Sequence, residues 1–229
     1  DDLIATRGPR VVDMVTKADR IVHETTPTVL EALVREAALI RLHRPPANTE
    51  GKDDKTFLYA VITQEEIPRV LVMRGKDIDF KTKCAKPCLP AGRDGQKLKA
   101  FYGPFPSGTQ LREGLRLIRR IFPFFDTEKP IGTKSKHQTA MIEFNTQIKQ
   151  YPRVYSVQEY GRTIRHVMLF LSGRGKELRA TLEKEMRQAA KEECFEDASQ
   201  ARRELFALDH IQDVSLIKDE HLADSREKN

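Results

Sequence analysis

Positive charge recurs at helical spacing in the middle of this sequence, where arginines fall one, three or four positions apart. Residues three and four apart lie on one face of a helix, so these side chains would form a stripe. Such a stripe could follow the phosphate backbone of a nucleic acid, although a solvated surface is the commoner fate of helix arginines. The candidate DNA-binding residues are Arg112, Arg116, Arg119 and Arg120.

The cysteines give a weaker chemical signal. Cys84 and Cys88 lie four positions apart in a Lys-rich segment, and Cys194 stands far from them. Structural zinc needs four ligands, and no second pair lies nearby, so a basic surface loop is the favoured interpretation. Three cysteines in 229 residues also argue against a disulfide framework and for a reducing compartment.

The composition describes a soluble chain. Charged residues make up 32% and the mean hydropathy is −0.55. No apolar run approaches the length of a membrane span, and the first residues lack the pattern of a signal peptide, so we expect a cytoplasmic protein. The net charge of +6 favours a polyanionic partner, but only weakly, because many proteins with this charge bind no nucleic acid.

The arginine stripe must be positioned by a helix in the centre of the chain. Ser107 can cap this helix, and its apolar face recurs every three or four residues, from Leu111 to Phe122. Two β-branched, apolar runs precede it, TFLYAVIT at 56–63 and RVLVMR at 69–74, and are predicted as strands.

Helices are predicted at both ends of the chain. Thr26 and Pro27 give an N-cap and a first helical position for a helix that ends at Pro45. A short strand is expected just before it, at 20–24. Ser156 and Glu159 form a capping box for a later helix.

Two amphipathic helices follow within 176–212. Their apolar pattern breaks at Cys194 and then restarts, which predicts that they fold back on each other through a very short connection. Such a hairpin buries too little surface to be stable alone and usually needs a partner face or a second hairpin.

Three stretches, in the same order, resemble the UvrC family. KLKAFYGPFPSGTQLREGLRLIRRIFP, at 97–123, is the most specific match. EKEMRQAAKEECFEDASQARRELFALDHI, at 183–211, resembles the UVR motif, and TPTVLEALVREAALIRLHRPPANT, at 26–49, resembles the last part of the GIY-YIG nuclease domain.

This resemblance implies an α+β fold: the remnant of a GIY-YIG domain and a small mixed middle region, followed by a helical UVR hairpin. The expected divisions are 1–50 for the partial nuclease domain, 51–125 for the mixed α/β middle region, 126–175 for a linker and helix, 176–212 for the UVR hairpin and 213–229 for a tail.

In the family, a helix glutamate binds the metal of the nuclease and an asparagine follows the Pro turn. Glu36 and Asn48 occupy these positions and are the candidate catalytic residues, with Glu36 as the ligand of Mg²⁺ or Mn²⁺. The GIY and YIG strands, which should precede this segment, are not present in the sequence, so we expect nuclease activity to be absent or impaired. The family's cysteine cluster is also missing from 124–155, so no iron–sulfur or zinc site is expected.

The family incises damaged DNA during nucleotide-excision repair, as a subunit of excinuclease ABC. The resemblance therefore implies a subunit that docks to UvrB through the hairpin and to damaged double-stranded DNA through the basic middle region. A non-catalytic adaptor for UvrB and DNA, and a metal-dependent nuclease with an unrecognised site, remain open alternatives. The expected UvrB-binding residues are Met186, Ala190, Phe195, Glu196, Ala198, Ala201, Arg202, Leu205 and Leu208.

Overall fold

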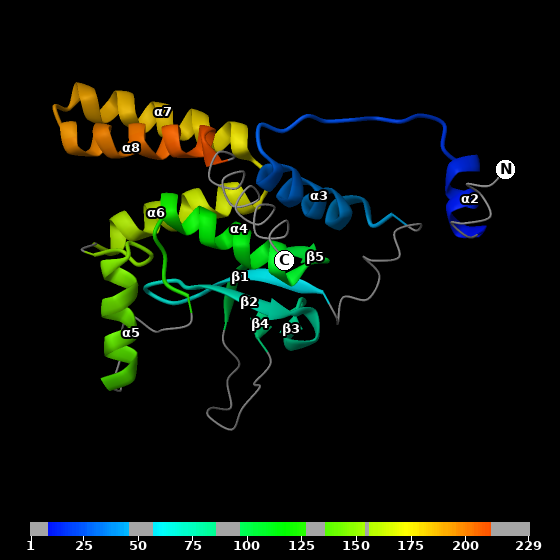
Figure 1. Cartoon of the computed structure of the whole chain (residues 1–229), viewed down its shortest axis with the longest axis horizontal. Coiled ribbons are helices and arrows are strands. Elements are labelled where there is room, and N and C mark those ends of the chain that lie inside the picture. Colours follow the sequence, from blue (N-terminus) through cyan, green and yellow to red (C-terminus); the bar gives the residue numbers. More distant parts are fainter. Residues whose placement is uncertain (1–8, 46–56, 86–96, 127–135, 154–155, 212–229) are drawn as a thin grey trace, which may run out of the picture.

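The computed structural model describes residues 9–45, 57–85, 97–126, 136–153 and 156–211, and within them the fold is α+β, as predicted (Figure 1). The helices are α2 (Pro9–Thr16), α3 (Val29–His43), α4 (Gly108–Ile121), α5 (Lys136–Gln147), α6 (Val157–Leu171), α7 (Gly175–Lys191) and α8 (Phe195–Asp209). The strands are β1 (Leu58–Thr63), β2 (Val70–Arg74), β3 (Ile78–Asp79), β4 (Cys84–Ala85) and β5 (Leu98–Phe105), and a short 3₁₀ turn, η1 (Gly75–Asp77), follows β2.

The central sheet has three antiparallel strands in the order β2-β1-β5, and β3 and β4 form a separate two-stranded ladder. Because side chains alternate along a strand, β1 contributes buried side chains to both faces of the sheet. Ala60 and Ile62 enter the main core, whereas Tyr59 and Val61 enter a smaller cluster on the other face. The two strands predicted at 56–63 and 69–74 are therefore confirmed and form the first hairpin of the sheet.

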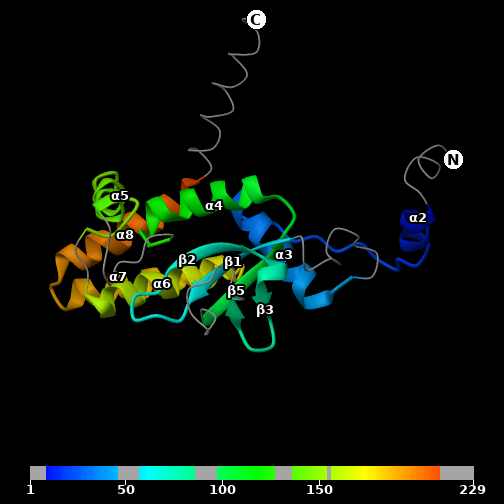
Figure 2. The same ribbon diagram turned by 90° about the horizontal axis from the view of Figure 1, so that it is seen from below.

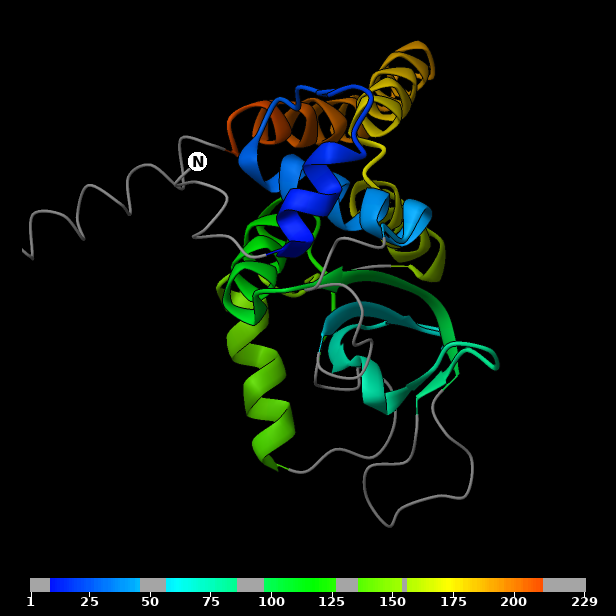
Figure 3. The same ribbon diagram turned by 90° about the vertical axis from the view of Figure 1, so that its right-hand side faces the viewer.

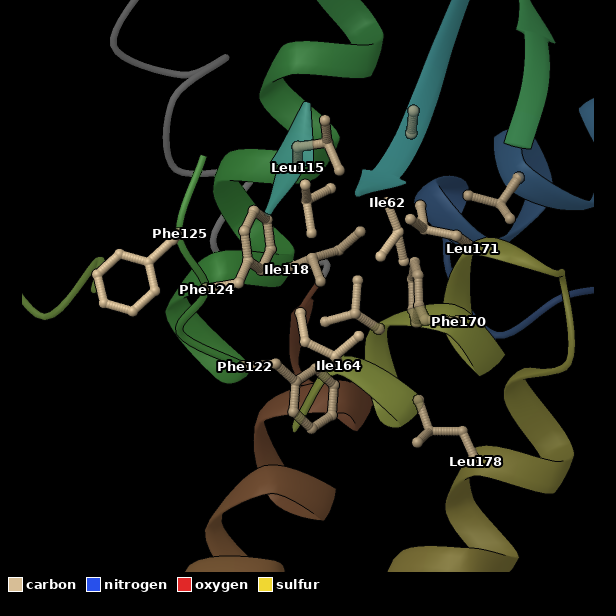
Figure 4. Close-up of a cluster of buried hydrophobic side chains, with 14 of the residues drawn as sticks. Ile62, Leu115, Ile118, Phe122, Phe124, Phe125, Ile164, Phe170, Leu171 and Leu178 are labelled. Carbon is tan, nitrogen blue, oxygen red and sulfur yellow. The ribbon is translucent and has the colours of Figure 1, made fainter. Parts of the chain in front are cut away.

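The main core lies between the sheet and the helices (Figure 4). Figures 1 and 3 show α3, α6 and the α7–α8 hairpin stacked on one side of the three-stranded sheet. The apolar face predicted for the arginine-bearing helix is confirmed, because its residues are buried in this core. Fully or nearly fully buried members come from eight elements: Val34 of α3, Ile62 of β1, Val70 of β2, Phe105 of β5, Ile118 of α4, Ile164 of α6, Leu178 of α7 and Leu208 of α8.

Side-chain caps begin α3, α4 and α6, whereas α7 and α8 start without one. Ser107 caps α4, and Ser156 and Glu159 form the predicted capping box of α6. The start of α3 differs from the prediction, because Thr28 and not Thr26 is the N-cap. The Thr28 hydroxyl accepts a hydrogen bond from the Glu31 amide at 3.1 Å, so α3 begins two residues later than expected.

The chain before α3 lies apart from the core. The strand expected at 20–24 is not formed, and the Ile21 side chain is 95% exposed. A β-branched run needs a neighbouring strand to satisfy its backbone, and the described residues place none beside it. Figures 1 and 2 show α2 at the end of the molecule that is farthest from α5. Within the described ranges, no helix is both long and apolar enough to cross a membrane.

Candidate functional site

The α7–α8 hairpin presents two different faces. Its inner face, which we define as Leu178, Leu182, Ala201 and Leu208, is buried against the rest of the protein. Its outer stripe, which we define as Phe195, Arg202 and Phe206 of α8, is exposed to solvent. The stripe recurs at helical spacing over three turns of α8, so two exposed aromatic rings and one guanidinium group lie along the same side of the helix.

The connection between the two helices is as short as predicted. Glu192 ends α7 and Cys194 is the N-cap position of α8, which leaves Glu193 between them with a φ of 58°. The Cys194 amide donates to the Ala189 carbonyl at 2.9 Å and closes the last turn of α7. The reversal therefore occurs without a glycine at the left-handed position.

An ion-pair network fixes the base of the hairpin to α3. The guanidinium of Arg179 donates to both carboxylate oxygens of Glu31, at 2.7 and 3.2 Å, and its Nε donates to Asp209 at 2.9 Å. These hydrogen bonds raise the pKa of Arg179 above its usual range, and those to Glu31 have the largest effect. A side chain at Gly175 would collide with the Glu31 carboxylate, so the first residue of α7 must stay small. The network sets the angle at which the hairpin leaves the core.

A second polar cluster joins α6 to both hairpin helices. Arg162 lies 2.7 Å from Glu185 and 3.5 Å from Glu204, and the buried His166 ring lies 3.3 Å from Glu185. Burial alone would raise the pKa of Glu185, but hydrogen bonds from His166 and Arg162 lower it to about 2. Burial raises the pKa of Glu204, and this effect outweighs the Gln200 hydrogen bond and the Arg162 charge. Two carboxylates around one cation thus have opposite pKa shifts.

The expected UvrB-binding residues divide between the two faces. Ala201 and Leu208 belong to the inner face, so they pack the hairpin onto the protein and cannot meet a partner directly. Phe195, with 70% of its surface exposed, and Arg202 belong to the outer stripe. Among the others, Ala190 and Glu196 are exposed, and Met186, Ala198 and Leu205 are half-buried.

Phe206 is a further candidate for partner binding, in addition to the residues predicted from the sequence. It is 64% exposed and stacks on the His210 ring, with 3.9 Å between the ring centroids. Its position eleven residues after Phe195 places it on the same face of α8. That spacing was a usable signal in the sequence.

The predicted arginine stripe is exposed at three of its four positions. Arg112, Arg116 and Arg120 lie on the solvent side of α4. Arg119 turns inward instead, where its Nη2 bonds Asp126 at 2.7 Å and its guanidinium lies 4.5 Å from the Phe124 ring centroid. Only 12% of its side chain is exposed, so Arg119 holds the segment after α4 in place and is not available to a phosphate backbone. The reason is local, because Arg119 lies beside Ile118 on the edge of the apolar face.

The candidate metal carboxylate lies on α3. Glu36 is exposed and lines a groove of about 470 Å³ together with Glu24 and His43. Glu24 forms an ion pair with Arg35 at 3.0 Å. A hard cation that keeps most of its waters could be held by the Glu36 carboxylate alone. In the part of the chain that the structure describes, no three His, Cys, Asp or Glu side chains lie close enough together to hold a metal ion. Asn48 and Cys88 lie outside the described residues.

The residues of the two polar networks were not found from the sequence. Arg179 and Glu31 are 148 positions apart, and Arg162 and Glu185 are 23 apart. The one usable signal was the presence of Arg162 and His166, four apart, next to the apolar positions of α6. A polar pair there indicates a buried network, but it does not identify the partners.

Several known proteins are similar to most of this chain. The chain is 32% identical over 218 residues to UvrABC system protein C of Synechocystis sp. and 32% identical over 203 residues to that of Carboxydothermus hydrogenoformans. It is 28% identical over 211 residues to that of Pseudomonas putida. These alignments cover 89–92% of this chain but only 30–32% of the relatives, so the chain spans about a third of their length. No family model matches the chain, and no solved structure gives a significant match.

Proposed function

We propose that this chain, which is UvrC-like over about nine-tenths of its length, acts in nucleotide-excision repair as part of the UvrABC system on damaged DNA. Within that system the α7–α8 hairpin would act as a UVR motif and dock to UvrB, and α4 would contact DNA. The observation that supports docking best is the outer stripe, in which two exposed aromatic residues and Arg202 share one side of a helix whose opposite face is buried against the protein.

The outer stripe has the properties of an interface core. Exposed aromatic residues on a rigid support are typical anchors of protein–protein interfaces, since they bury a large area with little loss of conformational entropy. The Arg179 and Arg162 networks join α8 to the rest of the protein through Asp209 and Glu204, so we expect the stripe to be presented in a fixed orientation. An isolated hairpin would lose this advantage.

UvrB binding to the full chain tests the docking proposal. Phe195→Asp or Ala198→Asp should weaken binding tenfold or more in calorimetry, because a charge would be buried in the interface without a partner. Phe144→Asp is the matched control, since Phe144 is 55% exposed on α5, away from the hairpin. Docking through this stripe is refuted if the variant of Phe195, which belongs to the stripe, binds UvrB as tightly as the control does.

The exposed arginines of α4 support the DNA part of the proposal. Arg112, Arg116 and Arg120 should contribute binding to duplex DNA that falls steeply with salt, because each phosphate contact releases a counterion. Replacing all three by Gln should weaken the binding and flatten its salt dependence. Equal salt slopes for the two proteins would exclude this surface as the DNA contact.

Metal-dependent incision is the second candidate, and the exposed Glu36 carboxylate in its groove is the observation that favours it. With UvrA, UvrB, a lesion-bearing duplex and Mg²⁺ or Mn²⁺, cleavage that disappears with Glu36→Gln would support a metal site there. Retention of the chain on the UvrB complex without cleavage would instead support the non-catalytic adaptor.

A further inference from the structure

A groove of about 780 Å³ continues the inner face of the hairpin toward its tip. On α7 its lining residues recur at helical spacing from Thr181 to Glu192, which is one face of the helix over about three turns, or roughly 16 Å. This face also carries Leu178 and Leu182 nearer the base, where they are buried. The groove is therefore the part of the inner face that α6 leaves uncovered.

Four apolar residues lie among the mostly polar residues that line the groove. Tyr160 of α6, Ala189 of α7, and Pro123 and Pro152 from neighbouring segments line it. The Tyr160 ring is almost fully buried, and its hydroxyl donates to the Pro68 carbonyl at 2.6 Å, so this part of the floor is fixed. Two helices with a hollow between them accept a third helix as the natural packing element, since its side chains enter the space between their ridges.

The rim of the groove is acidic. Arg162 and Glu185 form an ion pair at 2.7 Å, so their charges cancel. The other charged residues of the lining are three acidic ones, Glu159, Glu192 and Asp197, and one basic one, Lys184. Backbone and side-chain hydrogen bonds from Ser156 lower the pKa of Glu159, so that carboxylate stays ionised. The charged residues that line the groove are thus net negative, whereas the whole chain has a net charge of +6. This negative charge repels a phosphate backbone and attracts lysine and arginine.

We propose that this groove is a second docking site, which binds an amphipathic helix of a partner protein with an apolar face and flanking basic residues. The apolar face would contact the half-buried Ala189, Pro123 and Pro152. The basic residues would meet Glu159 on α6 and Asp197 on α8. The site is separate from the outer stripe, because Asp197 and Gln200 lie on the opposite side of α8 from Phe195 and Phe206. It does not depend on the proposed binding of UvrB or DNA.

Synthetic peptides provide the probe. A labelled helical peptide of about three to four turns, with leucines on one face and lysines on the flanks, is titrated with the full chain and followed by fluorescence anisotropy. A version with glutamate at every lysine position, and a scrambled version of the basic peptide, serve as controls. We expect the basic amphipathic peptide to bind at least about tenfold more tightly than either control.

Charge-reversed variants then locate the binding. The combined substitutions Glu192→Lys and Asp197→Lys should weaken the binding of the basic peptide about tenfold. The neutral pair, Glu192→Gln with Asp197→Asn, should have an affinity between those of this variant and the unchanged protein. The matched control is Glu183→Lys combined with Glu143→Lys, which changes the net charge equally at exposed positions outside the groove.

Each outcome decides for or against the site. Equal binding of the acidic or scrambled peptide overturns the proposal, and so does an equal loss in the matched control, since binding would then follow net charge alone. Sedimentation of the chain alone tests a second copy as the occupant. If the chain is a dimer and the combined Glu192→Lys and Asp197→Lys substitutions dissociate it, a second copy occupies the groove and the proposal is overturned. If the chain is a monomer and binds the basic peptide, the proposal is supported.

Discussion

The inner face and the outer stripe of the hairpin come from the same helical pattern but have different surroundings. Leu178, Leu182 and Leu208 are at most 1% exposed, whereas Phe195 and Phe206 keep more than half of their surface in water. The amphipathic spacing predicted that apolar residues would need cover. It did not show that other elements of the protein bury the inner face and leave the outer stripe exposed.

The difference follows from which elements reach the hairpin. The α6 helix packs along the base of the inner face, and α3 is tied to the same end by Glu31. No described element covers the outer stripe, so its apolar residues are free for a partner. The inner face therefore determines stability, and the outer stripe should determine binding.

Removing a large side chain from the inner face should have the largest effect. Leu182→Ala should lower the free energy of unfolding by about 2–5 kcal/mol, because the side chain is fully buried and a cavity would remain. Phe206→Ala, on the outer stripe, should lower it by less than about 1 kcal/mol. Urea denaturation followed by circular dichroism measures both, and similar values for the two variants would abolish the distinction between the faces.

Breaking the network at the hairpin base should have a smaller effect. Arg179→Ala should lower the free energy of unfolding by about 2 kcal/mol, since the largely buried Glu31 carboxylate would lose both of its hydrogen bonds to the guanidinium. A double-mutant cycle with Glu31→Gln separates this pair from other effects of the substitution. The control is Arg187→Ala, whose pair with Glu183 is exposed and should contribute less than about 0.5 kcal/mol. A null result for Arg179→Ala would mean that packing alone holds the hairpin.

The smallest effect is expected in the pH dependence of stability. The pKa of Glu185 is about 2 in the folded protein, below its ordinary 4.5, so the unfolded chain binds more protons in this range. Its stabilising contribution is present above pH of about 4.5 and is lost as the pH falls toward 2. The raised pKa of Glu204 has the opposite sign, since acidification relieves the burial of its charge.

Glu185→Gln should therefore make the loss of stability between about pH 5 and pH 2 shallower. Denaturant titrations at several pH values measure this slope, with the exposed Glu183→Gln as the control. An unchanged slope would place the acid sensitivity elsewhere in the protein.

Local patterns were sufficient for much of the fold. Continuous β-branched, apolar runs predicted β1 and β2, the spacing of Leu111, Leu115 and Ile118 predicted the buried face of α4, and Ser156 with Glu159 predicted the start of α6. Each of these features depends on residues close together in the chain. Spacing and propensity carry this kind of information well.

Features that depend on distant contacts were predicted poorly. The strand expected at 20–24 had suitable residues but no neighbouring strand among the described elements. Arg119 fitted the charged stripe by spacing, yet Asp126 and the ring of Phe124 hold it inward. The division of the hairpin into two faces also required knowing where α6 lies, and the amphipathic pattern alone cannot provide that.

The main core brings residues from nearly the whole chain together, and this has a consequence for the order of folding during synthesis. Val34 of α3 and Leu208 of α8 belong to the same buried cluster. A ribosome releases the chain from its N-terminus, so α3 and the sheet must wait for α8 before their shared core can close. Contacts with this sequence separation slow folding, so the part of the core to which Leu208 belongs would be completed last.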